Sequence, residues 1–189
     1  MMTSMISIGY WVWLAGYTYI SAFTAQPQST MTIKGTSTIH DWEMKTEKVE
    51  AVASVLMEDQ KLVNLNDFVG TVKVESLKSG KPGMDGNCYD ALKAEKHPVI
   101  TFKMKQLNKI DPVTKKISAL FTVTIAGTTR DMVVDGVATE IENDFLRIRG
   151  EKALKMTDFK VTPPSFMFGS ITTGDAITLV FDMVMANKK

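Results

Sequence analysis

The sequence predicts an all-β protein, an antiparallel barrel or sandwich of about eight strands with one short inserted helix. Short segments of alternating apolar and polar residues follow one another along most of the chain, separated by turn residues. Only the stretch 79–104 combines turn residues, helical spacing and a proline stop. Because nothing alternates strand with helix over the length that parallel crossovers need, the strands are expected to be antiparallel.

The overall composition excludes several classes of function. The 189 residues suit one domain, and 22 basic residues nearly balance 21 acidic ones, so there is no electrostatic basis for binding nucleic acid. A single cysteine excludes an internal disulfide framework and a cysteine-rich metal site. Two distant histidines leave little material for a metal centre, and no cofactor is expected.

Residues 1–25 differ from the rest of the chain. No charged side chain occurs before Lys34, and a mostly apolar and aromatic run is followed by small and polar residues. This order is typical of a secretory signal peptide cleaved near Ala25, although the usual positively charged start is missing. The prediction is therefore a signal at 1–25 and a domain at 26–189, periplasmic or secreted and without a membrane span after cleavage. An uncleaved anchor or a first strand of the domain are the alternatives.

From Thr30 onward the chain is predicted to form strand after strand. The cleanest alternation lies at 117–125, and the following residues 126–129 predict a tight hairpin because Gly127 can adopt a positive φ. A short turn or helix is expected at 62–65. The other strands are expected at 31–35, 49–57, 68–77, 99–107, 130–141, 145–151 and 177–185.

One short helix is predicted near residues 87–95. Turn residues precede it, and Pro98 ends it by pushing His97 out of helical geometry. Asp85 or Asn87 can accept hydrogen bonds from its first turn. A helix this short is not stable alone, so it is expected to dock on the open end of the barrel. Its apolar face is formed by Cys88, Ala91 and Leu92.

Large apolar side chains occupy the inward positions of several predicted strands. An eight-stranded barrel can be filled by such side chains or can hold one ligand, and the pattern leaves both possibilities open. In the second case, flexible methionines would adapt to a long apolar chain. The candidate lining residues are Phe68, Val72, Val74, Leu92, Ile100, Phe102, Met104, Phe121, Val123, Ile125, Leu146, Ile148, Leu179, Phe181 and Met183.

Five motifs follow one another along the chain, at 35–42 (GTSTIHDW), 76–80, 84–94, 97–102 and 125–130. Together and in this order, they resemble those of the YceI-like family of polyisoprenoid-binding, lipocalin-like proteins. The resemblance covers residues 31–185, and the first motif has the His-Asp-Trp form rather than the form with serine after histidine. A second departure is Lys160, where many relatives have glycine.

The resemblance implies an exported, lipocalin-like barrel of eight strands that holds a long isoprenoid chain of the polyprenyl or quinone type. His40 and Arg130 are candidate contacts for the polar head group, and a homodimer is a further possibility. The alternative from another class is an envelope interaction or stress protein whose barrel is filled and binds no lipid.

Catalysis is not expected. His40 beside Asp41 could form a base with an orienting carboxylate, which would suggest a hydrolase. However, adjacent strand residues point to opposite faces, and no Gly-x-Ser-x-Gly motif supplies a nucleophile. His97 is expected to be a satisfied polar residue at the helix end, and Cys88 a small apolar contact.

Overall fold

The computed structural model describes residues 19–58, 61–142, 144–166 and 169–188. One short α-helix, α1 (Pro82–Ala91), and two 3-10 helices, η1 (Val74–Ser76) and η2 (Met156–Phe159), accompany the sheet in this part of the chain. The strands are β1 (Tyr19–Ala25), β2 (Thr30–Ser37), β3 (Trp42–Thr46), β4 (Val49–Glu58), β5 (Lys61–Lys73), β6 (Val99–Ile110), β7 (Lys116–Ile125), β8 (Thr128–Glu142), β9 (Phe145–Lys155), β10 (Ser165–Phe166) and β11 (Ile171–Asn187).

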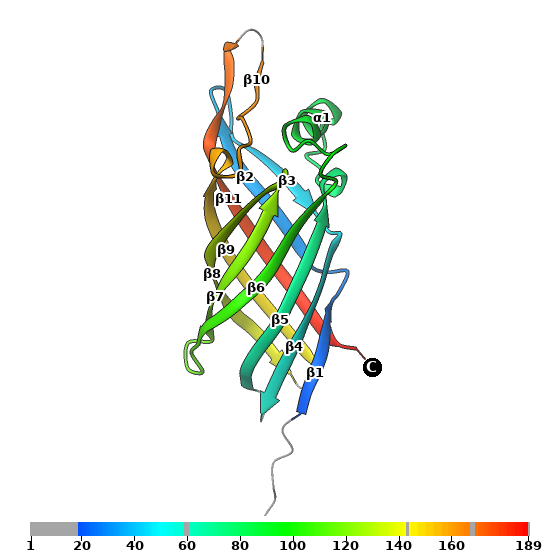
Figure 1. Ribbon diagram of the computed structural model, residues 1–189, viewed down its shortest axis with the longest axis vertical. Helices are drawn as coiled ribbons and strands as arrows, with labels where there is room; N and C mark the ends of the chain where they lie inside the picture. Colours follow the sequence, from blue (N-terminus) through cyan, green and yellow to red (C-terminus); the bar gives the residue numbers. More distant parts are fainter. Residues whose placement is uncertain (1–18, 59–60, 143, 167–168, 189) are drawn as a thin grey trace, which may run out of the picture.

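Eight of these strands close an antiparallel barrel, which confirms the predicted fold class. They follow the order β1-β4-β5-β6-β7-β8-β9-β11, and β11 pairs back with β1. The other strands extend from β11. β2 pairs with β11, β3 pairs with β2, and the short β10 pairs with the beginning of β11. Figure 1 shows α1 and β10 at one end of the barrel and β1 with the C-terminus at the other.

The long strand β11 organises the barrel because three strands pair with it in addition to the short β10. Along one edge it pairs with β9, and along the other it pairs first with β2 and then with β1. Ser29 fastens the corner between β1 and β2. Its buried hydroxyl donates to the Val184 carbonyl at 2.9 Å and accepts from the Val184 amide at 3.0 Å. Both edges of the barrel are thereby joined on one strand.

The strand β1 lies where the predicted signal peptide meets the domain. It pairs with β4 over Tyr19–Thr24 and contributes Phe23, which has no exposed surface. Residues 1–18, the main part of the predicted signal, lie outside the described residues. The boundary near Ala25 stays a prediction. A cut there would remove β1 from the barrel, whereas a cut before Tyr19 would leave the barrel complete.

The structure corrects three of the predicted elements. The helix begins at Pro82, five residues before the predicted start, because proline fits the first helical position. Residues 62–65 are not a turn or helix but part of the continuous β5, in which Leu62 and Leu65 are buried. The strand expected at 68–77 ends at Lys73 and continues as η1.

The hairpin predicted at 126–129 is confirmed. Ala126 and Gly127 have φ values of 48° and 76°, so both central residues of the turn between β7 and β8 are left-handed, as in a type I′ turn. Among the described residues, no helix is both long enough and apolar enough to cross a membrane.

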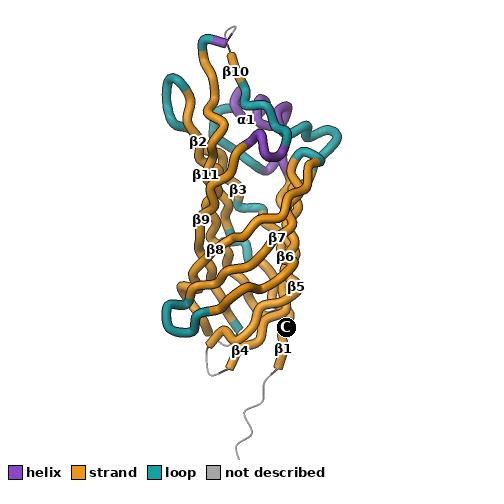
Figure 2. Tube along the Cα trace, turned by 60° about the vertical axis from the view of Figure 1, so that its left-hand side comes forward, coloured by secondary structure: helices purple, strands orange, loops and turns teal. Residues whose placement is uncertain are grey.

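The barrel is packed solid toward β1, and this region is called the packed half. Its centre is formed by side chains with no exposed surface from β1, β4, β9 and β11, which are Phe23, Val55, Leu146 and Met185. Small inward residues, Ala53 and Ala138 among them, let the strands approach one another there. Toward α1 several inward residues, such as Ile33, Leu154 and Leu179, are only half-buried because they border a cavity. Figure 2 shows the tilted strands of this wall and the loops above them.

Candidate ligand-binding site

An outer cavity of about 570 Å³ opens at the α1 end, a volume typical of small-molecule sites. It lies between α1, the β2–β3 hairpin and η2, elements that are far apart in the sequence. Most of its wall is apolar, with a few polar groups at the rim. Its main apolar contributors are Trp42, Met44, Ala91, Leu92, Met156 and Phe159.

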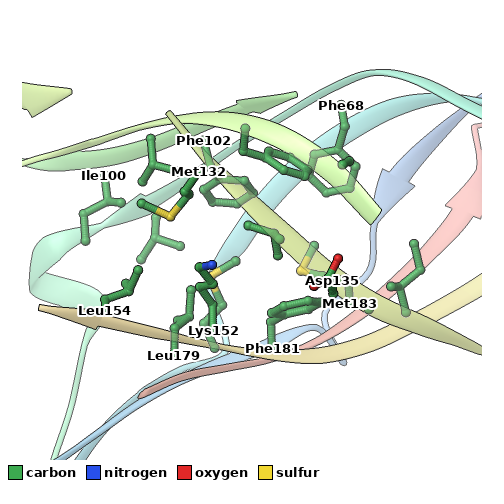
Figure 3. Close-up of a pocket in the computed structure, with 18 of the residues that line it drawn as sticks. Phe68, Ile100, Phe102, Met132, Asp135, Lys152, Leu154, Leu179, Phe181 and Met183 are labelled. Carbon is green, nitrogen blue, oxygen red and sulfur yellow. The ribbon is translucent and has the colours of Figure 1, made fainter. Parts of the chain in front are cut away.

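An inner cavity of about 160 Å³ lies within the barrel itself (Figure 3). Side chains of β2, β5, β6, β7, β8, β9 and β11 form its wall, which is almost entirely apolar. An engineered apolar cavity of about 150 Å³ stays dry and binds benzene. The inner cavity of this chain is therefore large enough for a segment of an apolar ligand, and it offers water few partners.

The two cavities meet at a neck. Four residues line both of them: Ile33, Ile125, Leu154 and Ile177. They come from β2, β7, β9 and β11, and each is aliphatic, so a chain passing the neck meets no polar side chain there. Together, the two adjacent cavities extend from the rim into the middle of the barrel, with these four residues between them, and this path is called the passage. We call the region around them the hollow half.

Aromatic rings form the floor of the passage. The ring of Phe68 lies 6.0 Å from that of Phe102 and 5.7 Å from that of Phe121, the latter in an edge-to-face arrangement that favours both rings. Figure 3 shows Phe68 and Phe102 on one wall and Phe181 on the facing wall. Phe181 rests on Gly150, where a β-carbon would collide with its ring. Because glycine has no side chain, this position leaves space for the Phe181 ring.

Two of the motifs seen in the sequence meet at the rim. The His97 ring packs on the hairpin at Gly127, where a β-carbon would stand 2.5 Å from the ring atom Cε1. The Trp42 ring similarly covers Gly35 and donates from Nε1 to the Thr36 carbonyl at 3.0 Å. Both aromatic side chains need a glycine beneath them, which explains why these residue types occur together.

Polar contacts fasten α1 over the outer cavity. Tyr89 lies with its hydroxyl 2.8 Å from the Leu77 carbonyl and accepts a bond from Lys78 at 2.6 Å. Asp85 is buried and accepts from the amide and hydroxyl of Ser79 at 2.7 and 2.6 Å. These bonds lower the pKa of Asp85 below its usual range. The predicted cap of the first helical turn is therefore wrong for Asp85, which ties the helix to Ser79 in the preceding loop.

The thiol of Cys88 faces the outer cavity. Burial raises its pKa to about 12, and the charge of Asp85 adds to the effect. The group is therefore a protonated thiol at neutral pH, which agrees with the expected apolar contact. Ala91 and Leu92, predicted to share its helix face, line the same cavity.

The two predicted head-group contacts lie in different surroundings. His40 lies at the rim of the outer cavity, exposed, with Nδ1 at 3.0 Å from the Asp41 backbone carbonyl and not paired with the Asp41 carboxylate. Arg130 lines neither cavity. Its Nε donates to the Asp158 carbonyl at 3.0 Å and so holds η2 against β8.

The structure brings most of the predicted lining residues together. Leu92 and Ile125 line the outer cavity, whereas Val74, Met104 and Leu146 are buried in the packed surroundings and line neither cavity. Those that line the inner cavity are Phe68, Val72, Ile100, Phe102, Phe121, Val123, Ile125, Ile148, Leu179, Phe181 and Met183.

Sequence reasoning missed part of the site. Met156 and Phe159 belong to η2, whose fold as a 3-10 turn carries no periodic signal. Trp42 belongs to the motif GTSTIHDW, but nothing in that motif predicts that its ring lines a cavity. Leu154 and Lys152 lie beyond the predicted end of their strand at 151, although the alternation of β9 continues through 155 and could have revealed them.

A closed antiparallel barrel with an apolar passage open at one end defines the class of lipocalin-like barrels that can enclose an apolar ligand. The YceI-like domain matches residues 21–185, and the chain belongs to that family. No curated protein matches the chain. Among the described residues, no three histidine, cysteine or carboxylate side chains gather as metal ligands would.

Solved structures of the same fold come from several bacteria. BcnA of Burkholderia cenocepacia is 16% identical, with a TM-score of 0.70 over 85% of this chain and 98% of its own. The YceI protein of Campylobacter jejuni is 22% identical, with a TM-score of 0.61 over 100% and 94%. A polyisoprenoid binding domain from Saccharophagus degradans, implicated in plant cell wall breakdown, is 10% identical, with a TM-score of 0.64 over 90% and 100%.

Proposed function

We propose that this protein binds one long apolar lipid chain of the isoprenoid type, polyprenyl or quinone, inside the hollow half of its barrel. The observation that carries the proposal is the pair of adjacent apolar cavities, one at the rim and one above the aromatic floor, that share the four aliphatic residues of the neck. The description of the Saccharophagus degradans domain as polyisoprenoid-binding supports the same ligand class.

Burial of the ligand would supply the binding free energy. Each methylene moved from water into an apolar site contributes about 0.8 kcal/mol. A passage with few polar groups offers few hydrogen bonds to orient a ligand, but it tolerates branched chains. The methionine side chains at its wall can adapt to such chains. The role is therefore sequestration or transport of the lipid, without chemical change.

The filled-barrel alternative fits only half of the molecule. A filled barrel would be dense along its whole length, whereas this barrel is dense in the packed half and holds a cavity in the hollow half. A hydrolase is disfavoured because the His40 ring contacts the backbone carbonyl of Asp41 and not its carboxylate. The histidine therefore lacks the orienting partner that a general base needs. Non-catalytic binding is the simpler proposal.

Export to the periplasm or beyond is part of the proposal and is supported by the apolar, charge-free start of the chain. Because β1 completes the barrel, we place the cut before Tyr19 instead of near Ala25. N-terminal sequencing of the protein recovered from the periplasm of a bacterial host tests this. A mature chain starting at 26 or later would overturn the placement.

The ligand itself is tested by mass spectrometry on an organic extract of the purified, folded protein. We expect a lipid with isoprene repeats in stoichiometric amount. A protein that yields no lipid, even after incubation with quinones and polyprenyl phosphates, would favour the filled-barrel alternative.

Variants locate the ligand. Phe121→Arg places a charge on the floor and should abolish lipid uptake, whereas Val133→Arg places the same charge on the outer face of the neighbouring β8 and should leave uptake unchanged. Ile125→Trp blocks the neck without a charge and should also reduce uptake. Unchanged uptake in folded Phe121→Arg and Ile125→Trp proteins would contradict binding in the passage.

A further inference from the structure

Lys152 interrupts an apolar row on the inner face of β9. Alternate residues of this strand face the interior, and the row runs Leu146, Ile148, Gly150, Lys152, Leu154. Figure 3 shows the Lys152 side chain pointing from β9 into the inner cavity, beside Leu179. A lysine at an inward position is unusual, because its charge must be hydrated or paired.

Strand register fixes the depth of Lys152 in the passage. It is two residues below Leu154 of the neck and two residues above Gly150, on which the floor ring Phe181 rests. At about 3.3 Å per strand residue, each of these separations is about 7 Å along the strand. Lys152 therefore lies midway between neck and floor, well below the polar groups of the rim.

The Lys152 amine has no partner in the part of the chain that the structure describes. Among the described residues, none forms a hydrogen bond or an ion pair with the Lys152 side chain. The other charged residue at the inner cavity is Asp135 of β8, which is exposed and makes no ion pair with Lys152. Elsewhere on β9 the contrast is clear, since Arg149 on the outer face pairs with Asp182 at 2.9 Å.

The wall beside Lys152 is incomplete. β8 and β9 pair from Glu142–Phe145 up to Val137–Arg149, and the described residues above that point form no further pairs between the two strands. Gly150 still lies against the backbone of Asp135, so the seam runs between 128–134 of β8 and 151–155 of β9, and Lys152 beside it is half-buried. Water can hydrate the amine while the cavity is empty.

A bound chain changes this balance. A neutral chain that fills the inner cavity would displace water around Lys152 and leave its charge without a partner, which is unfavourable. A ligand with an anionic end would instead form a charge-assisted hydrogen bond in apolar surroundings. A carboxylate matches the single positive charge, whereas a phosphate carries about −1.5 to −2 and would find no second cation among the lining residues described.

We propose that Lys152 is a specificity-determining residue that binds the carboxylate of an acidic isoprenoid lipid. The acid end lies inward at Lys152, and the apolar chain extends through the neck into the outer cavity. This inference rests on the proposed function, because it requires that a lipid chain occupies the passage. It adds a preference for the acid and an orientation of the chain.

The test compares three ligands with the same chain, farnesoic acid, its methyl ester and farnesol, by titration calorimetry at pH 8 on the lipid-free full-length protein. We expect the acid to bind at least about tenfold tighter than the ester, the scale of one charge-assisted hydrogen bond. Lys152→Met should remove this preference while keeping or improving ester binding. Lys152→Arg should retain it.

Lys34→Met is the matched control, because it removes the same charge from the exposed face of β2. It should leave the acid preference unchanged, and thermal unfolding checks that each variant is folded. An acid preference that persists in Lys152→Met would overturn the inference and show that the lysine turns outward through the seam. Tighter binding of farnesyl phosphate than of the acid would overturn the carboxylate assignment. If none of the ligands binds the wild type, the proposed function itself fails.

Discussion

The packed half and the hollow half are made by the same strands with the same alternation, yet one is solid and the other is not. Toward β1, inward residues such as Leu146 have no exposed surface, whereas toward α1 inward residues such as Leu179 border a cavity. The difference lies in how the ring closes. In the packed half β1 joins β11 to β4, but in the hollow half β2 takes its place on β11 and β3 is added beside it.

The added strand widens the barrel at the α1 end. β3 reaches the opposite wall through the bridge between Lys45 and Lys78 and through the adjacent hydrogen bond between the Thr46 and Ser76 hydroxyls at 2.8 Å. Since barrel diameter grows with the number of strands, side chains that fill the narrow part cannot fill the wide part. The comparison teaches that a cavity can arise from strand connectivity without a change in residue type.

The largest expected effect is on the free energy of unfolding, and the same substitution, leucine to alanine, in each half tests the comparison. Leu146→Ala should lower the free energy of unfolding by about 2–5 kcal/mol, because it opens a void in a dense core. Leu179→Ala should lower it by less than about 1.5 kcal/mol, because its side chain already borders empty space. Urea denaturation of the lipid-free protein measures both. Equal losses would mean that the hollow half is collapsed in solution.

A second pair of variants tests whether the rim is tightly packed although the interior is hollow. Gly127 and Gly80 have nearly the same φ, 76° and 79°, but only Gly127 lies against a side chain, the His97 ring. Gly80→Ala should cost about 1 kcal/mol from backbone strain alone. Gly127→Ala should cost at least about 1 kcal/mol more, because the methyl group collides with the ring. Equal costs in urea denaturation would show that the ring moves away freely.

A smaller, local effect is expected from acid at the attachment of α1. The pKa of Asp85 is lowered in the folded protein, chiefly by the hydrogen bonds from Ser79. Its stabilising effect is therefore fully present above the pKa of an unfolded aspartate and is lost as the pH falls through the folded value. Amide exchange in α1 should speed up relative to β11 below pH 4, roughly the ordinary aspartate pKa.

Asp85→Asn is the control for this acid effect, since it removes the titrating group. Exchange in α1 of this variant should be faster at neutral pH and should change little more on acidification than exchange in β11. If the wild type and the variant show the same pH dependence, Asp85 does not hold the helix.

The smallest effect uses the lone cysteine as a probe of the hollow half. Because the pKa of Cys88 is raised to about 12, alkylation by iodoacetamide at pH 8 should be at least about tenfold slower than in the urea-unfolded chain. Bound lipid should slow it further, since the thiol faces the outer cavity. An alkylation rate that does not respond to lipid would place the ligand elsewhere.

Much of the fold could be predicted because apolar and polar residues alternate along each strand. Residues 117–125 and Gly127 predicted a strand and a hairpin that the structure contains, and the inward row of β7 lines the cavity as expected. Helix bounds were harder to predict. Pro82 starts α1 well before the apolar face on which the prediction rested, and Asp85 bonds to Ser79 in the preceding loop.

The sequence by itself determined that this chain is an antiparallel all-β protein with alternating apolar residues, because a period of two is a local property of each strand. That the sheet closes into a barrel depends on the pairing of β1 with β11, which are far apart in the sequence. Only the tertiary structure decided which of these residues meet a neighbour and which face a cavity. Leu146 and Leu179 are indistinguishable as residues, and the ring of strands around each makes the difference. The same holds for Lys152, whose inward direction follows from alternation but whose isolation follows from where β8 and β9 part.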